Sequence, residues 1–190
     1  MGDASNDNPF LATRGLPPYD KMEASQVAEA MDRVIAMAEK KIDDIEQNLT
    51  PTWEGVMQPL EALDLPFSYA WSPVGHLLGV KNSDDLRTAH EAIQPRMVEL
   101  SLRINQSRPI YDCLKALQAE PDWNRLDEAQ RRAIEGKVLQ AELAGVGLQG
   151  KQKERFLQIS RKLSWISTKF SNNVLDARKQ FELIIEDVGN

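Results

Sequence analysis

Two histidines and one cysteine are the side chains of this sequence best suited to hold a metal ion or to act as a nucleophile. His76 and His90 lie fourteen residues apart, whereas a hydrolytic zinc site of the His-Glu-x-x-His kind needs two imidazoles one helical turn apart. We expect His76 to pack among its apolar neighbours Val74 and Leu77, and His90 to lie on a helix surface. The two histidines therefore predict no metal site.

The remaining chemistry is equally sparse. Cys113 is the only cysteine, so no intramolecular disulfide can form, and we expect a structural thiol because no activating base can be identified for it. No glycine-rich phosphate loop and no Gly-x-Ser-x-Gly motif occurs, and no carboxylate stands alone in an apolar run. The sequence predicts no catalytic residue, no metal ligand and no cofactor for this chain by itself.

Charge and hydropathy exclude two classes of partner. The net charge is −6 and the basic residues are scattered, which argues against nucleic acid, since that partner needs a clustered basic face. No run of eighteen apolar residues occurs, so we predict no membrane span. The first eight residues are polar and acidic and lack the basic and apolar regions of a signal peptide. Together with the single cysteine, they predict a cytoplasmic protein.

Apolar residues at helical spacing predict an all-α fold, an antiparallel bundle of about six helices with short connections. The helical domain is expected over 20–180, with helices over 24–48, 50–80, 83–105, 108–119, 127–144 and 151–180. Within the second helical region, Pro59 and Pro66 predict a kink or a break, and Ser72-Pro73 predicts a new turn. Ahead of this domain, we expect a disordered tail over 1–8 and an extended arm over 9–19, docked through Phe10, Leu11, Leu16 and Tyr19.

The last helix carries a stripe and runs directly into an apolar segment. The positions of this stripe, apolar except for Asn173, recur at alternating spacings of three and four, a pattern that puts them on one helix face: Phe156, Ile159, Leu163, Ile166, Phe170, Asn173 and Ala177. The period then changes to two, and Phe181, Leu183 and Ile185 share one side of a predicted short β-strand within 181–190. No second strand is predicted, so this strand lacks a partner within the chain. We therefore expect the chain to continue into a further domain or to borrow a partner.

Four polar or aromatic residues of this last helix are candidates for an interface. Trp165 lies opposite the main stripe; it is either buried on both sides or an exposed indole that contacts a missing domain. Asn172, Asn173 and Asp176 gather just before the predicted strand. We expect them to form a structural network at the helix-to-strand transition rather than to contact substrate.

Several collinear segments resemble one enzyme family. They are Asn8-Pro9-Phe10-Leu11, Leu16-Pro17-Pro18-Tyr19, Thr52-Trp53-Glu54 with Gln58-Pro59-Leu60, Ser72 to Leu77, Glu142 to Leu148, and Phe170 to Ala177. In this order they resemble the N-terminal helical region of the oligopeptidase A and thimet oligopeptidase family of zinc metallopeptidases. The resemblance covers roughly residues 8–187.

The resemblance implies a role for the chain that its own residues do not reveal. In that family the whole enzyme hydrolyses short peptides in a deep cleft between two mostly helical halves. Its N-terminal region forms one wall and admits only peptides that fit. The zinc helix belongs to a later catalytic domain, which we expect to be the chain's partner and to be absent from these residues. No catalytic position of the family maps onto them.

Two other interpretations remain open. A free-standing helical interaction module, derived from such an enzyme, would bind a protein partner and could pair its terminal strands into a strand-exchanged homodimer. An independent enzyme is the third interpretation, and it conflicts with the missing catalytic groups.

Overall fold

The computed structural model describes residues 8–184, and within them it is all helical, with six α-helices and no β-strand. The helices are α1 (Val27–Gln47), α2 (Gln58–Val80), α3 (Asp84–Asn105), α4 (Arg108–Ala119), α5 (Glu128–Leu143) and α6 (Gly150–Gln180). The predicted all-α bundle is confirmed. In the described part, no helix is long and apolar enough to cross a bilayer.

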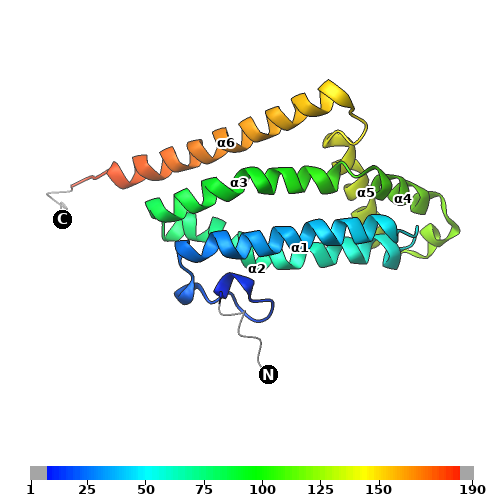
Figure 1. Ribbon diagram of the computed structural model, residues 1–190, viewed down its shortest axis with the longest axis horizontal. Helices are drawn as coiled ribbons and strands as arrows, with labels where there is room; N and C mark the ends of the chain where they lie inside the picture. Colours follow the sequence, from blue (N-terminus) through cyan, green and yellow to red (C-terminus); the bar gives the residue numbers. More distant parts are fainter. Residues whose placement is uncertain (1–7, 185–190) are drawn as a thin grey trace, which may run out of the picture.

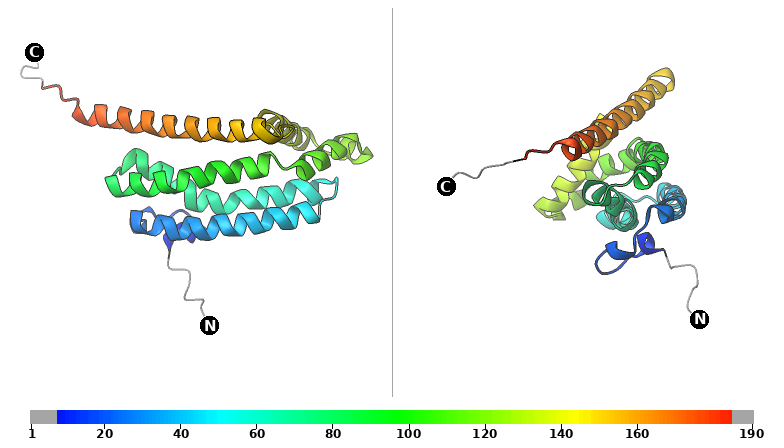
Figure 2. Two further views of the ribbon diagram at one scale, coloured as in Figure 1. Left: turned by 45° about the horizontal axis from the view of Figure 1, so that its top comes forward. Right: turned by 90° about the vertical axis from the view of Figure 1, so that its left-hand side faces the viewer.

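Successive long helices run antiparallel. The helices α1, α2 and α3 lie side by side, α4 and α5 form a corner at one end, and α6 returns along α3 (Figure 1). The left view of Figure 2 shows α6 as an outer layer over α3, on the side away from α1. The core therefore lies among the first five helices, and α6 is attached to it through α3.

Caps and apolar spacing determine where these helices begin and which side they bury. Ser83 accepts a hydrogen bond from the backbone N–H of Leu86 at the start of α3, and Asp127 does the same for Gln130 at the start of α5. Side chains from α1, α2, α4 and α5 fill the core at less than 2% exposure, among them Met31, Ile42, Val74, Leu114, Leu117 and Ile134. Burial of these apolar groups is the main source of the fold's stability.

The prolines do not interrupt α2. Pro66 and Pro73 both lie inside one continuous helix, so the predicted break and the new turn at Ser72-Pro73 are wrong. Pro73, Val74 and Ala70 are buried, and this packing holds the helix together although each proline removes a backbone donor. In the same way, α3 continues through Pro95.

The turn before α2 depends on a glycine. Thr52 Oγ1 accepts a hydrogen bond from Gly55 N at 3.0 Å, within a turn that has π-helical hydrogen bonding over Trp53–Met57. A β-carbon on Gly55 would lie 1.8 Å from Thr50 Oγ1 and 2.7 Å from the backbone oxygen of Thr50. Only glycine fits this close approach between two backbone segments.

A charged cluster joins the corner between α3 and α4 to α1. Ser107 is buried, and its hydroxyl donates to Glu46 Oε1 at 2.5 Å. Arg103 donates to both oxygens of Glu46, at 2.5 and 2.6 Å. These hydrogen bonds lower the pKa of Glu46, and the hydrogen bonding from Arg103 has the largest effect. The carboxylate therefore stays ionised and connects the two helices.

The arm lies against α1 and α2 through one residue above all. Phe10 is 1% exposed and stands in a short 3₁₀ turn over Pro9–Leu11, whose cap is the side chain of Asn8. The backbone here is not simply extended, because two 3₁₀ turns occur between residues 9 and 21. Leu16 is exposed, so its predicted role as an anchor is wrong. The predicted tail over 1–8 lies outside the described residues, apart from Asn8.

Replacing one leucine in the core and one on α6 by alanine should change the free energy of unfolding by very different amounts. Leu117→Ala should lower the free energy of unfolding by about 2–5 kcal/mol, because it leaves a cavity at a fully buried site. Leu163→Ala, at a site that is 61% exposed, should change it by no more than about 0.5 kcal/mol. Urea unfolding measures both, and equal losses would contradict this assignment of the core.

Candidate functional site

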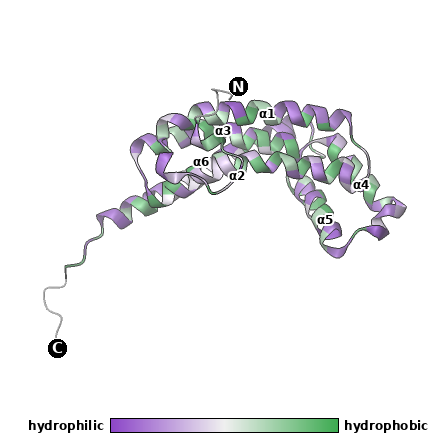
Figure 3. Cartoon of the chain, turned by 90° about the horizontal axis from the view of Figure 1, so that it is seen from below, coloured by the Kyte–Doolittle hydropathy of each residue, from purple (hydrophilic) through white to green (hydrophobic). Residues whose placement is uncertain are grey.

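The most unusual surface of the molecule is α6. This helix follows the turn at Gly145, whose φ of 81° ends α5, and it runs for 31 residues without one buried side chain. Its C-terminal end extends past the ends of α1, α2 and α3, with apolar and polar positions alternating along it (Figure 3). A long helix that buries no side chain needs either a partner outside the domain for one of its faces or polar contacts that hold it in position.

The side of α6 that faces α3 is largely small and polar. It presents an inner face of residues at four-residue spacing, Ser160, Ser164, Thr168, Asn172 and Asp176, together with half-buried Leu157 and Leu175. Gln94 of α3 donates its amide to the backbone oxygen of Ser164, at 3.2 Å, and to the hydroxyl of Thr168. These hydrogen bonds hold the middle of α6 on α3.

Charged groups extend the same contact in both directions. Arg161 pairs with Glu99 near the start of α6, and Asn172 Nδ2 donates to Glu91 Oε1 at 3.3 Å near its end. Each partner on α3 is separated from its partner on α6 by more than 60 residues of sequence. The contact is therefore tertiary, and it is made mainly by polar atoms.

The ion pair between Arg87 and Asp176 anchors the far end of α6. The guanidinium donates two hydrogen bonds to the two carboxylate oxygens, at 2.9 and 2.5 Å, in the bidentate geometry that arginine favours. Asn82 orients the arginine by accepting from its Nε at 2.6 Å. The hydrogen bonds from Arg87 lower the pKa of Asp176, and the pKa of Arg87 is raised in turn. Both groups stay charged at neutral pH.

The apolar side of α6 points away from the body. Counting about 100° per residue, the predicted stripe lies about half a turn from Ser164 and Thr168. We call its first five residues the outer stripe: Phe156, Ile159, Leu163, Ile166 and Phe170. The last four are exposed, Leu163 by 61% and Phe170 by 69%, and Phe156 is half-buried. A contiguous exposed apolar strip of this length is typical of a binding surface.

Trp165 lies between the inner face and the outer stripe. Its indole is 49% exposed, and the ammonium groups of Lys162 and Lys169 lie 4.2 and 5.0 Å from the ring centroid. Such cation–π contacts stabilise both lysines in place. Of the two alternatives for Trp165, burial within this domain is not what the described residues show.

The other predicted residues fall into two groups. Asn172 and Asp176 meet α3, as described above, whereas Asn173, Phe181 and Leu183 are exposed. Phe181–Ile184 are neither helical nor paired in a strand. The predicted strand is therefore not seen in these four residues, which is what the lack of a neighbouring ladder entails. Ile185 lies outside the described residues.

The histidines are placed differently from the prediction. His76 is exposed and lies against Tyr19, with 5.1 Å between ring centroids, and His90 stacks on Trp71 of α2 at 4.7 Å. Both individual expectations are wrong, because the face of a helix that is covered depends on its neighbours in space. Within residues 8–184, no three potential metal ligands cluster. Burial raises the pKa of the Cys113 thiol, so it is protonated and poorly nucleophilic at neutral pH.

Comparison with known protein families gives one clear match. The family model for the N-terminal domain of neurolysin and thimet oligopeptidase matches residues 31–153, which is more than half of the chain. The chain belongs to the neurolysin/thimet oligopeptidase family. The resemblance seen in the sequence motifs is thereby confirmed.

Individual relatives agree with this family. The chain is 37% identical over 185 residues to a probable cytosolic oligopeptidase A of Arabidopsis thaliana, matching 97% of this chain and 26% of that protein. It is also 37% identical over 182 residues to an organellar, chloroplastic/mitochondrial oligopeptidase A of the same plant, matching 96% of this chain and 23% of that protein. Oligopeptidase A of Haemophilus influenzae is 34% identical over 183 residues, which are 96% of this chain and 27% of that protein. The chain thus spans about a quarter of the length of these oligopeptidases.

Sequence reasoning missed the partners of α6 in this oligopeptidase-family domain. Arg87, Glu91, Gln94 and Glu99 on α3 provide the polar contact, and none of them stands out in the sequence. The available signal was the inner face itself, where small and polar residues recur every four positions on the side opposite the stripe. That spacing is typical of a helix face in close contact with another helix.

Removing the Asp176 carboxylate should loosen the end of α6. In Asp176→Ala, the backbone amides of the last turns of α6 should exchange with solvent severalfold faster, because Arg87 loses its partner. Amides of α1 and α2 should be unchanged. Asp112→Ala, which removes the ion pair with Arg108 inside α4, is the control and should leave exchange in α6 as it is. Equal exchange of α6 in all three proteins would show that this ion pair does not hold the helix.

Protonation of His90 should destabilise the domain at mildly acidic pH. Burial lowers the pKa of His90 from its ordinary value of 6.5, against a smaller opposing effect of Glu91. Because the unfolded chain then binds the proton more readily, stability is full above pH 6.5 and falls as the pH drops below it. In His90→Phe, which keeps an aromatic ring on Trp71, this loss should be smaller. Thermal unfolding between pH 7 and 5 measures it, His76→Phe is the matched control, and the same slope in His90→Phe as in the wild type would exclude His90.

Proposed function

We propose that this chain is the N-terminal helical domain of an oligopeptidase-A-like zinc metallopeptidase, and that it forms one wall of the peptide-binding cleft and limits the size of substrates. Membership of the family supports this proposal, as do relatives that are named oligopeptidases and extend about four times as far. In this view the chain does not catalyse by itself. Zinc and the hydrolytic groups belong to the catalytic domain of the longer protein, and short peptides are its substrates.

The single observation that carries the proposal is the outer stripe. An isolated domain gains nothing from leaving Leu163, Ile166 and Phe170 in water on a helix whose other side is already occupied. A further domain that covers this stripe removes the apolar surface from water. A domain that forms one wall of a cleft must join the other half of the enzyme somewhere, and we assign the outer stripe to that junction.

The cysteine content bears on the cellular compartment. We infer a cytoplasmic protein from the single cysteine, which can form no intramolecular disulfide. The names of the two plant relatives include both a cytosolic and a chloroplastic/mitochondrial oligopeptidase.

A free-standing interaction module is the second candidate. The observation in its favour is that Phe181, Leu183 and Ile184 are 70–75% exposed and form no strand within the described residues. Two copies that exchanged these segments would satisfy their backbone groups. Light scattering separates the candidates, since the module predicts a dimer that Leu183→Lys dissociates.

Peptidase assays test the main proposal. The longer protein that carries this domain should cleave short synthetic peptides, lose this activity when zinc is chelated, and leave folded proteins intact. Residues 1–190 alone should be inactive with added zinc, because their described part brings no three metal-binding side chains together. Cleavage by residues 1–190 with zinc, or an inactive longer protein that is folded, would each overturn it.

A further inference from the structure

The outer stripe of α6 has the spacing of a coiled-coil seam. Its residues and the two positions that follow, Asn173 and Ala177, recur at alternating steps of three and four through three heptads. Two positions in seven make a narrow strip, which suits the side of one partner helix better than a flat sheet or a broad core. Apart from half-buried Phe156, the strip is exposed, and the opposite side of α6 is bound to α3.

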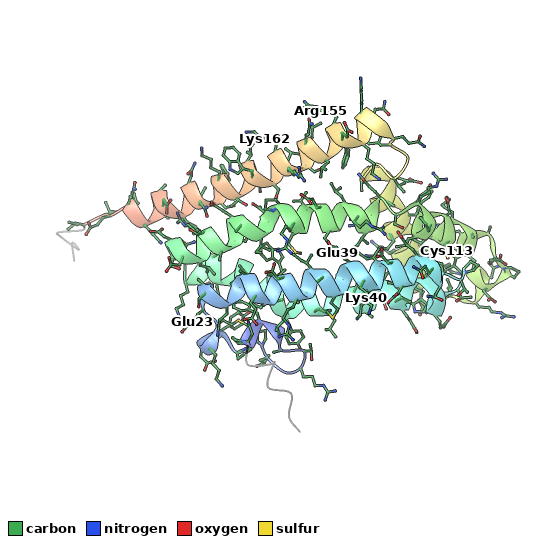
Figure 4. The ribbon with its side chains drawn as sticks, in the orientation of Figure 1. Glu23, Glu39, Lys40, Cys113, Arg155 and Lys162 are labelled. Atoms are coloured by element: carbon green, nitrogen blue, oxygen red, sulfur yellow. The ribbon has the colours of Figure 1, made fainter. Side chains whose placement is uncertain are left out.

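One edge of this seam carries only positive charge. Arg155, Lys162 and Lys169 stand beside it at seven-residue intervals and define a basic edge. Figure 4 shows Arg155 and Lys162 on the outer side of α6, away from α3. Trp165 holds both lysines beside the seam through its ring. These positions are those that form interhelical ion pairs in coiled coils.

The other edge carries no acidic residue that could neutralise the basic edge. It consists of Ser167 and Val174, together with Ser160 at the border with the inner face. The acidic side chains of α6 are elsewhere, since Glu154 lies in the groove beside Arg103 and Arg108, and Asp176 is bound to Arg87. The positive charge of the seam is therefore available to a partner.

This charge pattern argues against a second copy of the chain as that partner. In an antiparallel pair of α6 helices, the basic edge of one would face the basic edge of the other, and like charges repel. In a parallel pair, the basic edge would face Ser160, Ser167 and Val174, and no interhelical ion pair would form. An acidic partner helix would avoid this repulsion and would also form interhelical ion pairs with the basic edge.

We propose that the outer stripe binds one amphipathic α-helix whose apolar residues are flanked by aspartate or glutamate, and that the basic edge selects it. This inference rests on the proposed function, because the helix is assigned to the remaining three quarters or so of a full-length oligopeptidase chain. Apolar contact supplies affinity, and the charges on the edge supply orientation and discrimination. The basic edge thus acts as the selective part of a boundary between domains.

Two synthetic peptides test this inference on residues 1–190. Each has about 28 residues in four heptads with leucine at both core positions, and the flanking positions are glutamate in one and lysine in the other. Both peptides repel their own copies, so both remain monomeric. Fluorescence anisotropy at low salt should show at least about tenfold tighter binding of the glutamate peptide, as expected when three ion pairs replace three like-charge contacts. The difference should shrink in about 1 M salt, where charges are screened within about 3 Å.

Matched variants locate the binding. Leu163→Glu should abolish it, whereas Leu139→Glu, at another exposed leucine on α5, should not. Lys162→Glu with Lys169→Glu should reverse the preference between the peptides, whereas Lys40→Glu on the exposed side of α1 should leave it unchanged. Circular dichroism should show all variants folded, because every substituted side chain is exposed.

Each other outcome would overturn the inference. These are binding of neither peptide, equal binding of both, binding that survives Leu163→Glu, or a dimer of residues 1–190 that Leu163→Glu dissociates, which would make a second copy the occupant. If the peptide-binding test fails while the longer protein is an active peptidase, only the proposed partner helix is ruled out. If the longer protein is folded but inactive, the proposed function itself is ruled out.

Discussion

The structure depends on the way in which α6 is attached, with its polar side inward and its apolar side outward. Hydrogen bonds from Gln94 and the ion pair of Arg87 with Asp176 hold it on α3. Polar contacts of this kind fix direction more strongly than they add stability, since each bond to a neighbouring helix replaces a bond to water. The apolar side is thereby left exposed, and this division gives the domain an inner and an outer boundary.

The helices themselves could be predicted from the sequence because their signals are local. Ser83 and Asp127 are good caps and Gly145 supplies a left-handed stop, and the helices begin and end close to the predicted positions. Pro66 and Pro73 misled the prediction, since their cost is local but the packing that outweighs it is not. The histidines misled it for the same reason, because the aromatic rings that meet His76 and His90 belong to other elements.

The sequence predicted which residues of the candidate site share a helix face, but not where that face lies in the fold. Spacing identifies which residues of α6 share a face, but both faces of this helix are regular, and the sequence cannot say which one meets α3. The deciding contacts join residues as distant as Arg87 and Asp176, 89 positions apart. The oligopeptidases that the chain matches are about four times as long as the chain itself.

The length of α6 has a mechanical consequence. At about 1.5 Å per residue, its 31 residues form a rod of roughly 46 Å that is joined to the corner of the bundle by the turn after α5. A rotation of about 5° at that turn would carry the tip through about 4 Å, so it would have to break the ion pair between Arg87 and Asp176 near the far end. The ion pair between Arg87 and Asp176 thus acts at the end of a long lever arm, where one contact resists tilting of the whole helix most effectively.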